Sequence, residues 1–303
     1  MSSSNLRFGI DLGGTKIELV AIDDSGVRAQ RRVPTPSHDY DAIIQSIAEL
    51  VEACETALGA RGTVGIGMPG ALSRQTQTIK NSNTVCLNGK HFDRDLSARL
   101  GRPVRIQNDA NCFALSEAID GAAAGAQVVF GVILGTGVGG GLVVDQRALI
   151  GANAIAGEWG HNPLPWPHSD DSPAGSCYCG KRGCIETYLS GPGLARDYTQ
   201  LTGKTTTARD VAQLAAAGDQ NAKRILDRYC ERLARALATI INVLDPDVIV
   251  LGGGVSRLPL LYERVPALWG LHVFSDTVST RLVPAQHGDS SGVRGAAWLW
   301  PRK

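Results

Sequence analysis

FGIDLGGT at residues 8–15 returns as FGVILGTG at residues 130–137, and this repeat decides the fold. Each copy is an apolar run that ends in a glycine turn, and a second apolar run follows it, KIELVAI at residues 16–22 and GLVV at residues 141–144. The pattern predicts two β-hairpins, because such runs favour strands and glycine tolerates the turn between them. Two copies in 303 residues predict two α/β domains.

The two glycine turns together predict a site for nucleotide phosphates. The tip of such a hairpin presents backbone N–H groups and a Thr hydroxyl, which form a concavity suited to phosphate oxygens. The first copy carries Asp11 where the second carries Ile133, so one turn alone offers a carboxylate for a metal ion. This asymmetry favours Mg-ATP as the ligand.

Three other interpretations of the glycines compete with this one. Glycine turns are common as purely structural features, and the repeat argues against that interpretation. Gly135, Gly137 and Gly140 satisfy the dinucleotide fingerprint, but that motif requires a helix where GLVVDQR predicts a strand. Gly203 and Lys204 match the end of a P-loop, but Tyr198 stands at the position of its first glycine.

Composition restricts the class of protein. With 43% apolar and 19% charged residues, the chain is typical of a globular protein that stays in solution. A net charge of +1 argues against a nucleic-acid partner. The beginning of the chain shows no apolar signal segment, and no stretch has the length of a membrane span, so we expect a cytoplasmic protein.

Periodicity predicts further elements between and after the hairpins. We expect helices at residues 41–58, 92–100 and 110–125 and strands at 63–70 and 103–107. Further along the chain we expect a long helix that Pro246 ends, followed at 247–257 by a strand, a glycine loop and the start of a helix. A closing helix at 290–300 is expected to return to the first domain. Residues 151–192 lack periodicity, and an irregular segment of this length usually has a function.

Asp109 lies between a predicted strand and a predicted helix, in QNDANC at residues 107–112. One interpretation is an N-cap whose carboxylate accepts hydrogen bonds from the free N–H groups of the helix. The other is a general base that takes the proton from a substrate hydroxyl while that hydroxyl attacks the γ-phosphorus of ATP. Asn108 beside it is a candidate hydrogen-bond partner for a neighbouring hydroxyl.

The irregular segment contains a candidate metal site. Cys177, Cys179 and Cys184 form a C-x-C-x4-C pattern, and His161 lies 16 residues before it. Three thiolates and one imidazole complete a tetrahedral zinc site with no position for a catalytic water, so we expect a structural zinc. The alternative is three buried free cysteines. The other four cysteines lack such a pattern and are expected to be packing residues.

Glu158, His161 and Glu186 flank the same cysteine cluster. Single carboxylates are usually only solvated surface groups. Here their grouping favours a polyol site, because one carboxylate can accept hydrogen bonds from two adjacent sugar hydroxyls.

The motifs DLGGTK, GTG, ExGH and CxCGxxGCxE together resemble those of the ROK family of sugar kinases and repressors, over essentially the whole chain. The resemblance implies an actin-like, ribonuclease H-like fold of two α/β domains with the active site in the cleft between them. It implies a first domain at residues 1–120, completed by a helix at about 290–303, and a second at 121–289 whose zinc-binding loop is 157–186.

The resemblance also implies residue roles. Asp109 is the expected catalytic base. The expected sugar-binding residues are Gly70, Asn83, Asn108, Asp109, Glu158, His161 and Glu186. The expected ATP- and Mg2+-binding residues are Asp11, Gly13, Gly14, Thr15, Lys16, Thr136, Gly137, Gly252, Gly253 and Gly254. The expected zinc ligands are His161, Cys177, Cys179 and Cys184.

Within the family, AGEWGHNPLPW, CYCGKRGCIET and HGDSSGVRGAAWLW look most like the corresponding segments of a fructokinase that also accepts mannose. The implied reaction is transfer of the ATP γ-phosphoryl group to the 6-hydroxyl of a hexose, D-fructose first, in a homodimer. Glucose, mannose and N-acetylglucosamine are the alternatives. A sugar-responsive transcriptional regulator is the alternative of another class, disfavoured because too few residues precede Phe8 for a DNA-binding domain.

Overall fold

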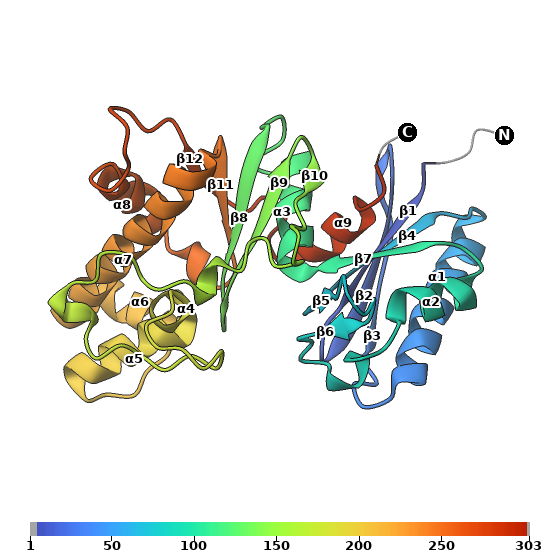
Figure 1. Cartoon of the computed structure of the whole chain (residues 1–303), viewed down its shortest axis with the longest axis horizontal. Coiled ribbons are helices and arrows are strands. Elements are labelled where there is room, and N and C mark those ends of the chain that lie inside the picture. The colour runs from blue at the N-terminus through green and yellow to red at the C-terminus, as the bar shows by residue number, and fades with distance from the viewer. Residues whose placement is uncertain (1–4, 302–303) are drawn as a thin grey trace. The chain divides into compact units, whose positions relative to one another are not determined.

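The computed structural model describes residues 5–301, apart from the side chain of Asp289, and divides them into two units (Figure 1). Unit 1 runs to Ala124 and resumes at 141–156 and from residue 289, and unit 2 holds 125–140 and 157–288. The sequence predicts 121–289 as the second domain, whereas within that range residues 121–124 and the segment 141–156 belong to unit 1. This segment joins unit 1 because its first residue lies against the helix that begins at Asp109: a Cβ on Gly141 would stand 2.4 Å from the carbonyl oxygen of Ala110.

Unit 1 contains a five-stranded sheet in the order β3-β2-β1-β4-β7. Its strands are β1 (Arg7–Leu12), β2 (Lys16–Asp23), β3 (Gly26–Pro34), β4 (Thr63–Met68) and β7 (Val104–Asn108), and a small pair is formed by β5 (Ala71–Leu72) and β6 (Ile79–Lys80). Strands β1 and β2 are antiparallel, whereas β1, β4 and β7 run parallel. The first predicted hairpin is therefore confirmed, with Leu12 opposite Ile17 next to the turn.

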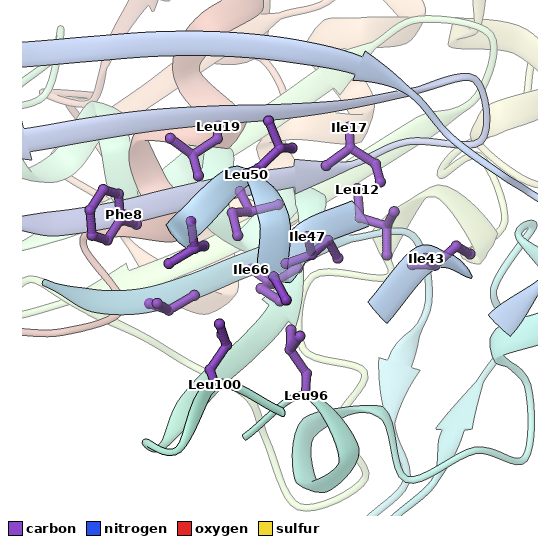
Figure 2. Packing of buried hydrophobic residues seen from close by; sticks show 14 of the residues in the cluster. Phe8, Leu12, Ile17, Leu19, Ile43, Ile47, Leu50, Ile66, Leu96 and Leu100 are labelled. Atoms are coloured by element: carbon purple, nitrogen blue, oxygen red, sulfur yellow. The ribbon is translucent and has the colours of Figure 1, made fainter. Parts of the chain in front are cut away.

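One face of this sheet forms the core of unit 1 with helices α1 (Tyr40–Leu58) and α2 (Phe92–Leu100). Alternation along β1 directs Phe8, Ile10 and Leu12 to this face, where all three are fully buried. Helix α1 presents Ile43 and Ile47, one turn apart, to the same cluster (Figure 2). Burial of each such side chain stabilises the unit by about 1.5–3 kcal/mol.

Helix α9 (Ser291–Ala297) packs on the opposite face of the sheet, beside α3 (Asp109–Ile119). The approach is so close that a Cβ on Gly9 would stand 2.0 Å from the carbonyl oxygen of Val293. A Cβ on Gly65 of β4 would likewise stand 1.9 Å from the carbonyl oxygen of Ala296. Only glycine fits at these two strand positions, so α9 packs directly against β1 and β4 of unit 1.

The second sheet has the order β10-β9-β8-β11-β12. Its strands are β8 (Val128–Leu134), β9 (Val138–Val144), β10 (Arg147–Ala148), β11 (Val248–Gly252) and β12 (Arg281–Pro284). The helices of unit 2 are α4 (Glu186–Leu189), α5 (Gly191–Thr202), α6 (Ala208–Ala216), α7 (Gln220–Leu244) and α8 (Leu260–Trp269). Strands β8 and β9 are neighbours on either side of the second glycine turn, as predicted. The long predicted helix is α7, which ends at a left-handed Asp245 before Pro246.

One detail of unit 2 differs from the prediction. After β11 the chain forms a short 3-10 turn at Val255–Arg257, and helix α8 begins only at Leu260. The glycine loop is thus followed by a single tight turn instead of a helix N-terminus. Pro259 fixes the entry into α8.

Two arginines of α7 hold the loop at residues 157–186 in place. Arg232 and Arg235 are buried, and both donate to the carboxylate of Asp171, at 2.7 and 2.9 Å. Arg235 also donates to the carbonyl oxygen of Pro165 at 2.8 Å. Buried charges need such full pairing, so this network fixes the path of the segment that carries the cysteine cluster. Among the described residues, no helix is both long and apolar enough to cross a membrane.

Candidate active site

Unit 1 brings two carboxylates to the same edge of its sheet. Asp11 lies near the end of β1, and Asp109 follows β7 as the first residue of α3. Both strands are parallel to β4 between them, and ligands of open α/β sheets bind at the carboxyl ends of such strands. The negative charge of Asp109 also contributes to the electrostatic environment of Asp11.

The structure assigns the N-cap of α3 to Asn108. The Oδ1 atom of Asn108 accepts from Ala110 N at 2.9 Å, and its Nδ2 donates to the carbonyl oxygen of Gly70 at 3.2 Å. Asp109 Oδ1 also accepts from Ala110 N, at 2.8 Å, from within the first turn. The helix thus has its cap without Asp109. Asn108 connects two of the predicted sugar-binding positions, Gly70 and Asp109.

Burial raises the pKa of Asp109 above its ordinary value, although hydrogen bonds from the backbone N–H groups of Ala110 and Asp109 oppose the shift. A carboxylate with a raised pKa is a stronger base than a solvated one. Burial, aided by the charges of Asp109 and Glu18, raises the pKa of Asp11 to about 6. A cation at Asp11 would therefore relieve an unfavourable buried charge.

The turn between β1 and β2 is tied to β3. Gly13 N donates to the carbonyl oxygen of Lys16 at 3.0 Å, and the Thr35 hydroxyl donates to the carbonyl oxygen of Gly13 at 2.7 Å. Gly14 and Thr15 are exposed at the tip. Lys16, an expected nucleotide contact, forms an ion pair with Glu18 at 3.2 Å.

Sequence reasoning missed Thr84, which lies beside this turn. Its hydroxyl is buried and has no hydrogen-bond partner among the described residues. A Cβ on Gly14 would stand 4.0 Å from this hydroxyl. The polar run NSNT at residues 81–84 is the one signal in the sequence for Thr84, and within this run the family resemblance implies a role for the exposed Asn83 alone.

Unit 2 contains the second glycine turn, which is fixed by Glu186. Glu186 Oε2 accepts from Val138 N at 2.9 Å, and a Cβ on Gly137 would stand 2.5 Å from that oxygen. Thr136 is exposed at the tip. The glycine loop 252–254 lies against the same strand end, because Gly252 pairs with Ile133 in the ladder between β11 and β8.

The structure brings the four predicted zinc ligands together. One ligand atom from each of His161, Cys177, Cys179 and Cys184 lies within 4.8 Å of every other. Cys179 Sγ and Cys184 Sγ are 3.7 Å apart, and Cys177 Sγ is 3.5 Å from His161 Nδ1. Bond lengths of tetrahedral zinc require about 3.8 Å between two sulfur ligands and about 3.5 Å between sulfur and nitrogen. The donor set and its spacing fit zinc.

Residues around the cluster anchor it to the second sheet. Trp159 is buried edge-on against Phe130, with ring centroids 5.6 Å apart, and its Nε1 donates to the carbonyl oxygen of Gly139 at 3.0 Å. Trp159 therefore fixes a short turn of the chain, which the exposed Glu158 precedes and which His161 ends. Glu158, His161 and Glu186 all belong to unit 2, whereas Asp11, Asn108 and Asp109 belong to unit 1.

Comparison with known proteins defines the class of this fold and site. The model of the ROK family matches residues 7–303. The chain is 43% identical over 299 residues to an N-acetyl-D-glucosamine kinase of Photobacterium profundum, covering 97% of this chain and 99% of the relative. A ROK hexokinase from Thermus thermophilus has 32% identity and a TM-score of 0.86, with 97% of both chains covered.

A ROK family glucokinase from Streptomyces griseus, solved in complex with glucose and AMPPNP, has 26% identity and a TM-score of 0.75, with 97% of this chain and 98% of that chain covered. The protein is thus an α/β protein of the actin-like, ribonuclease H-like kinase fold. It belongs to the ROK family.

Proposed function

We propose that this protein is an ATP-dependent sugar kinase that transfers the γ-phosphoryl group of ATP to the 6-hydroxyl of N-acetyl-D-glucosamine. The environment of Asp109 is the observation that supports this reaction type. Asp109 is a partly buried carboxylate with a raised pKa at the end of a parallel strand, and α3 is capped without it. The relative with 43% identity over nearly the full length of both chains supports the sugar.

In this proposal Asp109 accepts the proton of the 6-hydroxyl as its oxygen attacks the γ-phosphorus. The γ-phosphoryl group forms a bond to that oxygen, the bond to the β-phosphate oxygen breaks, and ADP leaves. Positioning by Asn108 matters because its two hydrogen bonds join the start of α3 to the loop at Gly70. A positioned base of this kind contributes about 10²–10⁴-fold in rate.

The two glycine turns are proposed to bind ATP. Gly14 and Thr15 in unit 1 and Thr136 and Gly137 in unit 2 present turn N–H groups and hydroxyls of the kind that bind phosphate oxygens. Gly253 lies close to the end of β8, so the loop offers flat backbone for the adenosine. Asp11 is proposed to hold Mg2+, which neutralises phosphate charge when it is bound.

Glu158, His161 and Glu186 are proposed to bind the hydroxyls that are not phosphorylated, with Asn83, Asn108 and Gly70 contributing from unit 1. Each carboxylate can accept hydrogen bonds from two adjacent hydroxyls, which suits a pyranose ring. The cysteine cluster is proposed to hold a structural zinc that positions His161 and Glu186. All four ligand positions are supplied by the chain, so this metal takes no part in the chemistry.

The motifs of the sequence resemble those of a fructokinase and favour fructose, with N-acetylglucosamine among the alternatives. The relatives support that alternative better than fructose, since those of 42–43% identity are N-acetyl-D-glucosamine kinases. One altered contact in a sugar pocket changes selectivity by about 10–200-fold, so motif resemblance alone discriminates poorly between hexoses.

Product analysis tests the proposal. Purified protein is incubated with Mg-ATP and N-acetyl-D-glucosamine, and the product is examined by phosphorus NMR. We expect a 6-phosphate ester, formed in step with ADP. A 1-phosphate would contradict transfer to the 6-hydroxyl and the proposed orientation of the sugar, and ADP release that does not depend on any sugar would contradict the kinase assignment itself.

A further inference from the structure

Tyr178, the residue between the first two cysteines of the cluster, has no role in the site as described so far. Its ring lies edge-on to the imidazole of His161, with centroids 5.1 Å apart and planes at 86°. The Tyr178 hydroxyl is 3.0 Å from His161 Nε2. The side chain is otherwise exposed, with 83% of the residue's surface accessible.

The two ring nitrogens of His161 thus have different partners. Nδ1 lies 3.5 Å from Cys177 Sγ, on the side of the metal cluster, and Nε2 lies on the side of Tyr178. A neutral imidazole that gives the lone pair of Nδ1 to a metal carries its proton on Nε2. Nε2–H therefore donates to the Tyr178 hydroxyl, which fixes both the tautomer and the orientation of the ring.

This arrangement conflicts with the proposed contact between His161 and the sugar. Because Nδ1 belongs to the metal, Nε2–H is the one donor that His161 can offer to a sugar hydroxyl. The Tyr178 hydroxyl already occupies the acceptor position.

We propose that Tyr178 is a positioning residue whose hydroxyl substitutes for a sugar hydroxyl on His161 Nε2 and is displaced when the sugar binds. This inference rests on the proposed function, because it needs a sugar that contacts His161. The exchange replaces one hydroxyl acceptor by another, so the N–H group of His161 is satisfied in both states. An exposed side chain moves away at little cost in packing.

The consequence is competition between Tyr178 and the substrate. Tyr178→Phe removes the hydroxyl and keeps the ring, so it removes the competitor while the edge-on contact to His161 remains. We expect KM for N-acetyl-D-glucosamine to fall by about two- to tenfold, because the variant no longer breaks a neutral hydrogen bond on binding. The kcat value should remain unchanged, since Tyr178 touches no reacting atom.

The experiment compares wild type, Tyr178→Phe and Tyr40→Phe as zinc-loaded full-length proteins. Tyr40 is the matched control, because its hydroxyl is also hydrogen-bonded to one side chain, as the donor to the carboxylate of Asp95, but it lies in unit 1 on α1. Tyr40→Phe should keep the wild-type KM. Zinc content is measured on all three proteins, and it should be equal.

A second measurement needs no turnover. Nitrogen-15 NMR of sugar-free, zinc-loaded protein reports the Nε2–H proton of His161, which we expect to exchange with water at least fivefold faster in Tyr178→Phe. An unchanged KM or an unchanged exchange rate would overturn the inference, and a raised KM would overturn it as well, because Tyr178 would then be a direct sugar contact. Wild type that phosphorylates no sugar would contradict the proposed function, and the NMR comparison would still test the contact to Tyr178.

Discussion

Glu186 links the cysteine cluster to the second glycine turn. Its Oε2 accepts from Val138 N at 2.9 Å, while its Oε1 lies 3.8 Å from Cys177 Sγ. One carboxylate is therefore shared by the turn proposed to bind phosphate and by the loop proposed to bind the sugar. Substitutions at this residue can separate these two tasks.

Glu186→Gln keeps an oxygen that accepts from Val138 N but removes the negative charge. We expect KM for the sugar to rise by about 10- to 100-fold, since a charge-assisted hydrogen bond is lost, and KM for ATP to stay within about threefold of wild type. Glu186→Ala also removes the acceptor, so KM for ATP should rise as well. Steady-state kinetics with each substrate varied distinguishes the two effects, and equal KM values for ATP in both variants would refute the link.

Asp109→Asn preserves the size of the side chain and an acceptor for Ala110 N but cannot take a proton. We expect kcat to fall by at least about 100-fold, with KM for the sugar changed little. The matched control is Asp39→Asn, which makes the same change at the N-cap of α1, where the side chain accepts from Ala42 N. Turnover near that of wild type in Asp109→Asn would reduce Asp109 to a structural role.

The raised pKa of Asp11 predicts a pH-dependent stability in the absence of ATP and Mg2+. The folded protein holds the proton up to a pH of about 6, whereas the unfolded chain loses it near 3.8. More protons are bound in the folded state across this window, so the free energy of unfolding falls as pH rises through it. Relative to Asp11→Asn, wild type should lose roughly 1 kcal/mol between pH 5 and 7.5.

Urea unfolding of both proteins across this range measures the difference. The comparison cancels the titrating groups that do not interact electrostatically with Asp11, which the two proteins share. A difference that is constant with pH would show that Asp11 is already ionised at pH 5.

Cys184→Ser should remove zinc, because Cys184 is a buried member of the cluster and lies 3.7 Å from Cys179. Loss of the metal frees His161 and Glu186, so sugar binding should weaken at least tenfold before the protein unfolds globally. Cys230→Ser is the control, since Cys230 is equally buried but lies within α7. Metal analysis that finds no zinc in active wild-type protein would contradict this prediction.

The sequence predicted those parts of the structure that short-range patterns determine. The first hairpin follows from apolar residues that alternate along the strands, and α1 follows from apolar residues at helical spacing. The cysteine cluster follows from a spacing of ligand residues that is typical of a tetrahedral metal site. The assignment of 141–156 to unit 1 could not be predicted, because it depends on the contact between Gly141 and the start of α3. Tyr178 could not be predicted from the sequence, because its proposed role depends on the position of the His161 ring, 17 residues earlier in the chain.

The proposed function of this chain is an ATP-dependent N-acetyl-D-glucosamine kinase activity. Its most direct test is ADP release coupled to a spectroscopic readout, measured for N-acetyl-D-glucosamine, glucose, mannose and fructose under identical conditions. We predict that kcat/KM is highest for N-acetyl-D-glucosamine, by at least about tenfold over the other three sugars. A higher kcat/KM for fructose would contradict the account of the substrate, and no sugar-stimulated ADP release would contradict the account as a whole.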